Sequence, residues 1–136
     1  MRLEVTRRSE LAVRALVVLR STPYRVKAPA LAEALGTTAA FVPQVVAPLV
    51  KAGWVQSDPG PLGGYQCVVE LDAVSVLDVI EAVDGETDGG QCVVADRPCT
   101  AQAPCVLHEA WKRARHELTS TLASLSLADL MVVVAS

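Results

Sequence analysis

The chain has 136 residues, enough for one domain or for one domain with an added long helix. Hydrophobic residues make up 51% and aromatic residues only 4%, so the expected core is aliphatic. No run reaches the roughly 18 apolar residues that span a bilayer, and the charged N-terminus does not resemble a signal peptide, so we expect a cytoplasmic protein without membrane contact. The net charge of −3 divides unevenly. Residues 1–66 hold eight Lys/Arg and four Asp/Glu, whereas residues 67–136 hold four and eleven, so phosphate contacts are expected from the first half.

The first two predicted elements are helices. Apolar residues recur at helical spacing from about Arg7 to Arg20, and Pro23 ends this pattern. A short second helix is expected over residues 29–35, because Pro29 suits a first helical position and Gly36 suits the residue just past the end.

A third helix is expected after a short turn. Thr37 or Thr38 is the candidate N-cap, and a 3.6-residue apolar pattern continues until Gly53. Helix, glycine-containing turn and helix over residues 29–53 have the spacing of a helix-turn-helix, although any pair of packed helices shares this pattern. Pro48 lies inside the third helix, and we expect it to kink or break that helix at a cost of about 3 kcal/mol.

A β-hairpin is predicted directly after the third helix. Trp54 and Val55 begin one short strand, SDPGPLGG supplies the turn, and YQCVV forms the second strand. A hairpin in this place is the wing of a winged helix. Gly60, Gly63 and Gly64 would let the backbone approach a phosphate or a minor groove closely, although an ordinary hairpin loop has the same composition.

The second half of the chain is predicted to hold two more helices. Ser75 and Asp78 resemble a capping box that opens a fourth helix, which Gly85 ends. Residues 85–104 show no periodicity. A long helix is expected from about Cys105, with an apolar seam that favours pairing with a second copy in a homodimer: Leu107, Trp111, Ala114, Leu118, Leu122 and Leu125. We therefore predict a mainly α protein with a small β-hairpin wing, in which residues 1–70 form a winged helix-turn-helix domain and residues 71–136 a ligand-binding loop and dimerisation helix.

Three closely spaced cysteines are the candidate metal ligands. Cys92, Cys99 and Cys105 form a C-x6-C-x5-C pattern on a segment without an apolar core of its own. Thiolates bind iron–sulfur clusters and zinc well, whereas paired C-x2-C zinc ligands are absent. Unligated thiols are the alternative. Cys67 lies apart in the wing and is expected in the core. His108 follows Cys105 at i+3, and would share its helical face if both lay in the first turn of the last helix.

Motifs along almost the whole chain resemble the IscR/NsrR-type family of winged-helix regulators. They are MRL, SELAVRALVVL, LAEALG, LVKAGWVQS, GPLGGY, LDVIEAVDG, the cysteine triplet, CVLHEAW and SLADL. The resemblance implies a homodimer built on the long last helices. It also implies an iron–sulfur cluster on Cys92, Cys99 and Cys105 that controls DNA affinity. The sensed signal in such proteins is cluster supply, nitric oxide or redox stress.

The fourth ligand varies within that family. The CVLHEAW motif resembles the version with a histidine after the third cysteine, which points to His108. Other members use a carboxylate from the first helix of the partner subunit, and Glu10 occupies that place here. We expect His108 and a 2Fe–2S cluster, with Glu10 as the alternative ligand and a 4Fe–4S cluster as the alternative cofactor.

The chain departs from the family pattern at three places. The first cysteine gap has six residues rather than five, Asp58 and Pro59 replace a common wing arginine, and the third helix carries Pro43 and Pro48. Few side chains that read DNA remain on that helix. The expected DNA contacts are Thr37, Thr38, Phe41, Gln44, Gly60, Gly63, Gly64 and Tyr65, with Arg7, Arg8, Arg25 and Lys27 as candidate phosphate contacts.

Two functions fit these observations. The first is a transcription regulator that binds double-stranded DNA and responds to an iron–sulfur cluster. The second is a cluster- or zinc-binding regulatory protein that acts through protein partners and binds little DNA. An enzyme or a small-molecule substrate is not expected, because the sequence has no C-x-x-C, no nucleotide-binding loop and no base paired with a nucleophile.

Overall fold

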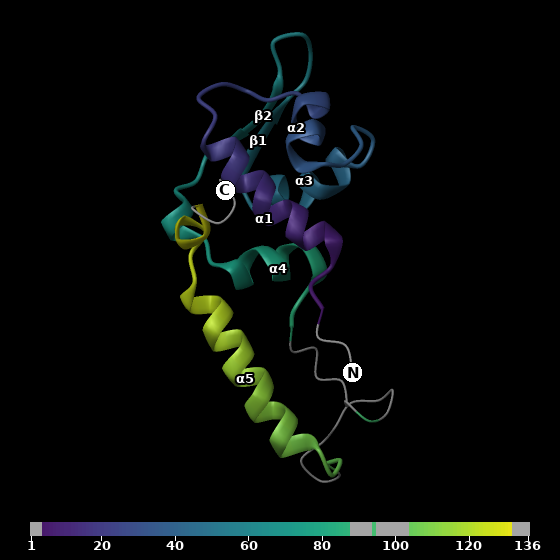
Figure 1. The fold of residues 1–136 in the computed structure, drawn as a ribbon, viewed down its shortest axis with the longest axis vertical. Helices are drawn as coiled ribbons and strands as arrows, with labels where there is room; N and C mark the ends of the chain where they lie inside the picture. The colour runs from purple at the N-terminus through teal and green to yellow at the C-terminus, as the bar shows by residue number, and fades with distance from the viewer. Residues whose placement is uncertain (1–3, 88–93, 95–103, 132–136) are drawn as a thin grey trace.

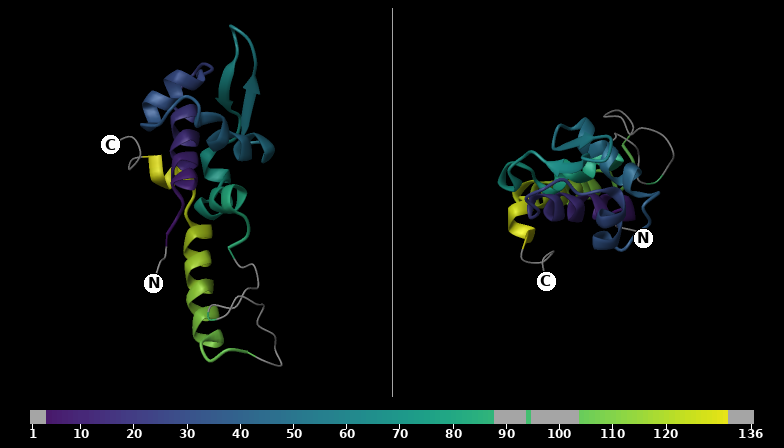
Figure 2. Two further views of the ribbon diagram at one scale, coloured as in Figure 1. Left: turned by 90° about the vertical axis from the view of Figure 1, so that its right-hand side faces the viewer. Right: turned by 90° about the horizontal axis from the view of Figure 1, so that it is seen from above.

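The computed structural model describes residues 4–87, 94 and 104–131, and these form a mostly helical chain with one two-stranded antiparallel hairpin, as predicted (Figure 1). The α-helices and strands are α1 (Arg7–Arg20), α2 (Ala28–Leu35), α3 (Val42–Lys51), β1 (Val55–Asp58), β2 (Gly64–Cys67), α4 (Val76–Asp84) and α5 (His108–Ser124). Two short 3₁₀ helices, η1 (Leu71–Ala73) and η2 (Leu127–Leu130), complete the order. We call α1–α4, the hairpin, η1 and η2 the body, and α5 the arm. Figures 1 and 2 show the arm extending away from the body.

Helix α1 lies at the centre of the body and has the predicted bounds. Thr6 caps its N-terminus, because the Thr6 side chain accepts a hydrogen bond of 3.1 Å from the amide of Ser9. One face of α1 supplies much of the core, and its buried apolar side chains are Leu11, Ala12, Ala15, Leu16, Val17 and Leu19. The helix contacts α2, α3, α4 and β2 as well as both 3₁₀ helices, so it lies against most elements of the body.

Helices α2 and α3 form the predicted helix-turn-helix pair, with two differences in detail. Helix α2 begins one residue early, at Ala28, and Gly36 ends it in the left-handed conformation at φ 71°. The expected threonine cap of α3 is wrong, because Phe41 occupies the N-cap position. The amide of Phe41 donates to the Thr38 carbonyl at 3.1 Å, so an extra turn separates the threonines from the helix.

Pro48 does not break α3, contrary to the sequence-based expectation. The helix continues to Lys51 with Pro48 inside it. Proline has no amide hydrogen for the carbonyl of Gln44, but Gln44 is exposed, so water can take that place. The opposite side of α3 holds the buried residues Val42, Val45, Val46 and Leu49, and their packing keeps the helix continuous.

The hairpin follows α3 as predicted. Strands β1 and β2 pair from Val55 with Cys67 to Asp58 with Gly64. Tyr65 and Val26 exchange two backbone hydrogen bonds of 2.9 and 2.8 Å, which fix β2 to the segment between α1 and α2. Strand β2 is thus held by β1 on one side and by Val26 on the other.

After the arm, the chain returns to the body, and this return involves two capping boxes. Ser75 and Asp78 form the predicted box at the start of α4, and Ser126 and Asp129 form an equivalent box at the start of η2. Ser75 and Ser126 are paired in an antiparallel bridge. Leu127 follows and is 0% exposed in the same apolar cluster as α1 and α3. The core therefore crosses the predicted boundary at residue 70, and the two-domain division stays a prediction.

The arm differs from every helix of the body in its burial. None of the 17 residues of α5 is buried. Among the residues that the structure describes, no helix is both long enough and apolar enough to cross a membrane.

Candidate nucleic-acid interface and metal centre

The predicted DNA-contacting residues of the helix pair are partly accessible. Thr38 and Gln44 are exposed, and Thr37 is half-buried. Phe41 is half-buried because its side chain packs against the core, so its ring contributes to the position of α3. Figure 1 shows α2 and the hairpin together at the end of the molecule opposite the start of α5. The helix pair and the wing could therefore contact one partner at the same time.

The geometry of the wing turn itself requires glycine at two of the three glycine positions, whether or not the wing binds DNA. The amide of Gly63 donates to the Gly60 carbonyl at 3.0 Å, which closes a turn around Pro61 and Leu62. A Cβ on Gly63 would lie 2.0 Å from the Asp58 carbonyl oxygen. A Cβ on Gly64, which has φ +135°, would lie 2.8 Å from the Val26 carbonyl oxygen. Both glycines are thus required by the hairpin.

Gly60 and Tyr65 complete the predicted wing contacts. Gly60 has φ +90°, and a Cβ there would meet open space, so its backbone is accessible to a ligand. Tyr65 is half-buried, and its side chain packs against the core of the body.

Two basic residues beside the wing are bound to the wing itself. The Arg25 Nε lies 2.8 Å from the Asp58 Oδ2, and both side chains are partly exposed. The Lys27 Nζ donates to the Pro61 carbonyl at 2.6 Å. Asp58 stands where the family was expected to carry a wing arginine. Where that arginine would offer a positive charge to DNA, Asp58 instead forms an ion pair with Arg25 of the same chain.

The other candidate phosphate contacts lie at the far end of α1. Arg7 pairs with Glu10 at 3.3 Å, and the Arg8 Nη2 donates to the Val83 carbonyl at 2.6 Å. The Arg7 contact stays within α1, whereas the Arg8 contact joins α1 to α4. They are therefore placed away from the wing.

The candidate metal centre begins at the start of the arm. Helix α5 starts at His108, three residues after the expected start near Cys105, so the condition that both residues lie in its first turn is not met. The amide of His108 donates to the Cys105 carbonyl at 3.1 Å, and this turn still keeps the two residues adjacent, with Cα atoms within about 7 Å. Both residues are half-buried, and Cys105 is a free thiol. A soft thiolate and an imidazole in this position fit a metal or an iron–sulfur cluster.

The remaining predicted ligands are not brought to this place. Cys92 and Cys99 lie outside the described residues. Within 4–87, 94 and 104–131, no three His, Cys, Asp or Glu side chains form a group that could hold a metal ion. Glu10 pairs with Arg7 and Arg14 on α1, and Figures 1 and 2 show α1 far from the start of α5. Within one chain, Glu10 therefore does not meet Cys105.

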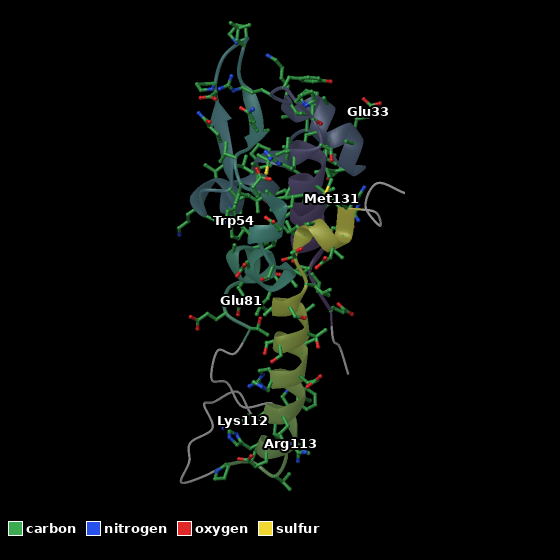
Figure 3. All side chains as sticks on the ribbon, turned by 90° about the vertical axis from the view of Figure 1, so that its left-hand side faces the viewer. Glu33, Trp54, Glu81, Lys112, Arg113 and Met131 are labelled. Carbon is green, nitrogen blue, oxygen red and sulfur yellow. The ribbon has the colours of Figure 1, made fainter. Side chains whose placement is uncertain are left out.

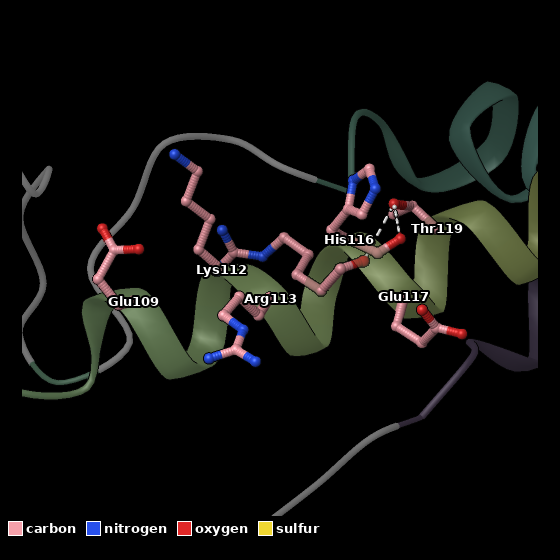
Figure 4. A pocket seen from close by; sticks show the side chains of 7 residues that line it. Glu109, Lys112, Arg113, His116, Glu117 and Thr119 are labelled. Carbon is pink, nitrogen blue, oxygen red and sulfur yellow. Dashed lines mark hydrogen bonds between the residues drawn. The ribbon is translucent and has the colours of Figure 1, made fainter.

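The flank of α5 beyond His108 carries charged and polar groups. Figure 4 shows Lys112, His116 and Thr119 on one side of the helix, and Arg113 and Glu117 on the other. A hollow of about 530 Å³ runs along this part of α5. The Thr119 hydroxyl donates to backbone carbonyls of the preceding turn, and His116 is exposed, as expected for a surface histidine. Figure 3 shows Lys112 and Arg113 at the distal end of the arm, remote from the wing.

Cys67 is a core residue, as predicted. It lies on β2, is 5% exposed and donates a hydrogen bond to the Val69 carbonyl at 3.4 Å. Burial raises the pKa of the Cys67 thiol, which keeps it protonated and unsuited to act as a ligand.

A polar cluster that the sequence analysis missed joins the start of α1 to the end of α4. The Asp84 carboxylate accepts hydrogen bonds from the Ser9 hydroxyl at 2.6 Å and from the Thr6 hydroxyl at 2.9 Å. Ser9 is 0% exposed, so the Asp84 contact satisfies a buried hydroxyl. Ser9 and Asp84 are more than 70 residues apart in sequence, and no local sequence motif predicts their contact. Asp84 directly precedes the segment that contains the predicted cysteine ligands.

The sequence matches known transcriptional regulators over most of its length. Residues 5–132 match the Rrf2 family, described as iron-dependent transcriptional regulators. A putative HTH-type transcriptional regulator, ORF2 of Azotobacter vinelandii, is 34% identical over 101 residues, which cover 74% of this chain and 61% of that relative. The HTH-type transcriptional regulator IscR of Aliivibrio salmonicida is 31% identical over 132 residues, 96% of this chain and 78% of that protein.

Solved structures share the fold. IscR of T. potens superimposes with a TM-score of 0.72 at 26% identity, over 98% of this chain and 89% of that one. CymR, the global cysteine regulator of B. subtilis, gives a TM-score of 0.76 at 22% identity, over 97% of this chain and 98% of that one, which shows the fold alone. These relatives are transcriptional regulators rather than enzymes. The chain belongs to the Rrf2 family of transcriptional regulators.

Proposed function

We propose that this regulator binds double-stranded DNA as a homodimer, and that its DNA affinity is set by an iron–sulfur cluster on Cys92, Cys99, Cys105 and His108. The observation that carries the proposal is the turn that holds Cys105 beside His108, where the arm begins. Similarity to IscR and to an iron-dependent family supports the choice of cofactor. The sensed stimulus of redox, nitric oxide or cluster supply belongs to the same proposal.

The burial pattern of the arm supports a dimer. A lone helix of this length is marginally stable in water, and none of the α5 side chains is buried. A second hollow of about 540 Å³ lies between α5, α4 and the N-terminal segment, and is lined in part by Val5, Ile80, Leu118 and Leu122. A second α5, packed along the apolar seam, would bury these side chains.

The proposed DNA interface joins the helix pair and the wing. Thr38 and Gln44 are exposed on the helix pair, and Gly60 offers accessible backbone on the wing. A dimer would read two half-sites separated by about one helical turn or a multiple of it. Affinity should fall steeply as salt concentration rises, because phosphate contacts release counterions.

Spectroscopy of protein purified without oxygen tests the cluster. The protein should be coloured and contain iron with acid-labile sulfide. Alanine in place of Cys92, Cys99 or Cys105 should each abolish the colour. Cys67→Ala is the matched control and should keep it, because Cys67 is buried in the wing. Colourless protein with stoichiometric zinc would contradict the cluster and favour a zinc or thiol switch.

A pair of variants tests the fourth ligand. His108→Ala should shift the anaerobic spectrum and shorten the lifetime of the cluster. Glu10→Ala should leave both unchanged, and His116→Ala controls for loss of any histidine from α5. If Glu10→Ala shifts the spectrum and His108→Ala does not, the ligand comes from the partner subunit and ties the cluster directly to its α1.

One observation favours the second candidate function, a regulator that acts through protein partners. Arg25 and Lys27, next to the wing, are engaged by Asp58 and Pro61. Selection from a random duplex pool with intact protein separates the two functions. Enrichment of a sequence supports DNA binding, whereas failure to enrich any duplex supports the protein-partner function.

A further inference from the structure

The tip of the wing presents an apolar side chain to solvent. Leu62 is 92% exposed, far more than the leucines of the core. Residues 59–64, PGPLGG, carry no charged side chain. Figure 1 shows this tip projecting beyond α2, at the end of the molecule that the helix pair occupies. The tip is therefore the most protruding part of the proposed DNA interface.

The exposure of Leu62 is fixed by contacts on both sides of it. The hydrogen bond from Gly63 to the Gly60 carbonyl closes the turn, and Lys27 holds the Pro61 carbonyl at 2.6 Å. Gly63 has no room for a side chain, so the turn packs tightly against the Asp58 backbone. Leu62 is thus presented on a braced turn, and a partner that binds it need not first order the loop.

The chemistry of the tip indicates how it would meet DNA. Residues 59–64 carry no basic side chain, and the nearest basic groups, Arg25 and Lys27, each already make a contact with the wing. A contact made by the tip residue itself is therefore apolar. The minor groove is about 6 Å wide, which a single projecting side chain can enter. Architectural proteins insert Leu or Pro there between base steps and bend the duplex.

We propose that Leu62 inserts as an apolar wedge into the minor groove beside the half-site and bends the DNA. The inference rests on the proposed DNA binding and adds the residue and the mode of contact. Insertion of a side chain requires a base step to unstack, and TA and CA/TG steps unstack most easily. Leu62 would therefore favour sites with such steps without forming a hydrogen bond to a base.

Binding and bending measurements with one duplex test this role. The probe is a duplex enriched from a random pool by the wild-type protein, prepared without oxygen and labelled at both ends for energy transfer. Leu62→Ala should lower affinity about tenfold, which corresponds to about 1.4 kcal/mol, and should reduce the bend. The dependence of affinity on salt should be unchanged, because no phosphate contact is lost. Val68→Ala, at a half-exposed position just past β2, is the matched control and should change neither quantity.

The outcomes separate this inference from the proposed function. If wild-type protein binds no duplex, both fail together. If it binds DNA and Leu62→Ala has wild-type affinity and bend, the wedge is wrong, the DNA-binding function stands, and the apolar tip belongs to a protein contact. A reduced affinity with an altered salt dependence and an unchanged bend would also overturn the wedge, because it would place the wing on the phosphate backbone.

Discussion

The body and the arm differ in how their apolar side chains are covered: those of the body are buried within the chain, whereas those of the arm are not. In the body, α1 packs against α2, α3 and α4, and side chains far apart in sequence, such as Leu11 and Leu127, share one core. In the arm, α5 has an apolar seam of the same kind, yet none of its side chains is buried. The comparison shows that a helical pattern in a sequence predicts a helix and its apolar face, but not which chain covers that face.

A core truncation in the body should have the largest effect. Leu16 is 0% exposed on α1, and Leu16→Ala removes buried methyl groups and leaves a cavity. We expect a loss of about 2–5 kcal/mol in the free energy of unfolding. Urea denaturation measures it, and the loss should be the same at all protein concentrations. A loss below about 1 kcal/mol would mean that the body has repacked around the site.

A charged residue on the arm should instead act through association. Leu118 is 45% exposed in the single chain, so Leu118→Glu should leave the body folded but shift the protein from dimer to monomer. Sedimentation velocity over a range of concentrations checks the shift. Glu117→Gln, next to it outside the apolar seam, is the control. If Leu118→Glu remains a dimer, the seam is not the interface and the contrast between body and arm needs another explanation.

Removing the two serine caps at the junction between body and arm should lower stability by a smaller amount, and the two losses should be coupled. Ser75→Ala and Ser126→Ala each remove the side-chain cap of a helix, at a cost of about 1 kcal/mol each. The two serines are bridge partners, so the double variant should depart from the sum of the single effects. Thermal unfolding of the three variants measures the coupling. Ser124→Ala, whose hydroxyl donates only to the Thr121 carbonyl, should change little; strict additivity would mean that the two caps are independent.

Thiol reactivity should give the mildest contrast. At pH 8 the Cys67 thiol should react with iodoacetamide more slowly than Cys105, because Cys67 is 5% exposed and its raised pKa leaves less thiolate at any given pH. Peptide mapping by mass spectrometry of cluster-free protein gives both rates. In denaturant the difference should vanish. Faster labelling of Cys67 in the folded protein would mean that the wing opens readily.

The sequence predicts the body well because its signals are local. The α1 bounds follow from a clear apolar period, and the Ser75 capping box follows from two residues three apart. The start of α3 is mispredicted because an extra turn after Thr38 has no distinct residue pattern. The continuity of α3 across Pro48 is missed because tertiary packing outweighs the local cost of proline.

The candidate site is harder to predict because its contacts are distant in sequence. Helix α5 was expected to start near Cys105 but starts three residues later, at His108, since periodicity does not mark the first residue of a helix. The Asp84 contact with Ser9 gives no local signal at all. Cys92 and Cys99 lie outside the described residues, so their ligand role stays a prediction.

The bridge between Ser75 and Ser126 has a consequence for how this part of the chain can change in length. It joins the two ends of a segment that contains α4, the cysteine-bearing stretch and α5. For a flexible loop whose ends are held in place, the entropic cost of closure depends only weakly on length, and even a doubling costs about 0.6 kcal/mol. We therefore expect that an inserted residue between the cysteines, such as the sixth residue of their first gap, leaves the fold of the body almost unaffected. Evolution could tune the spacing of the cysteines in small steps while the helix pair and the wing stay in place.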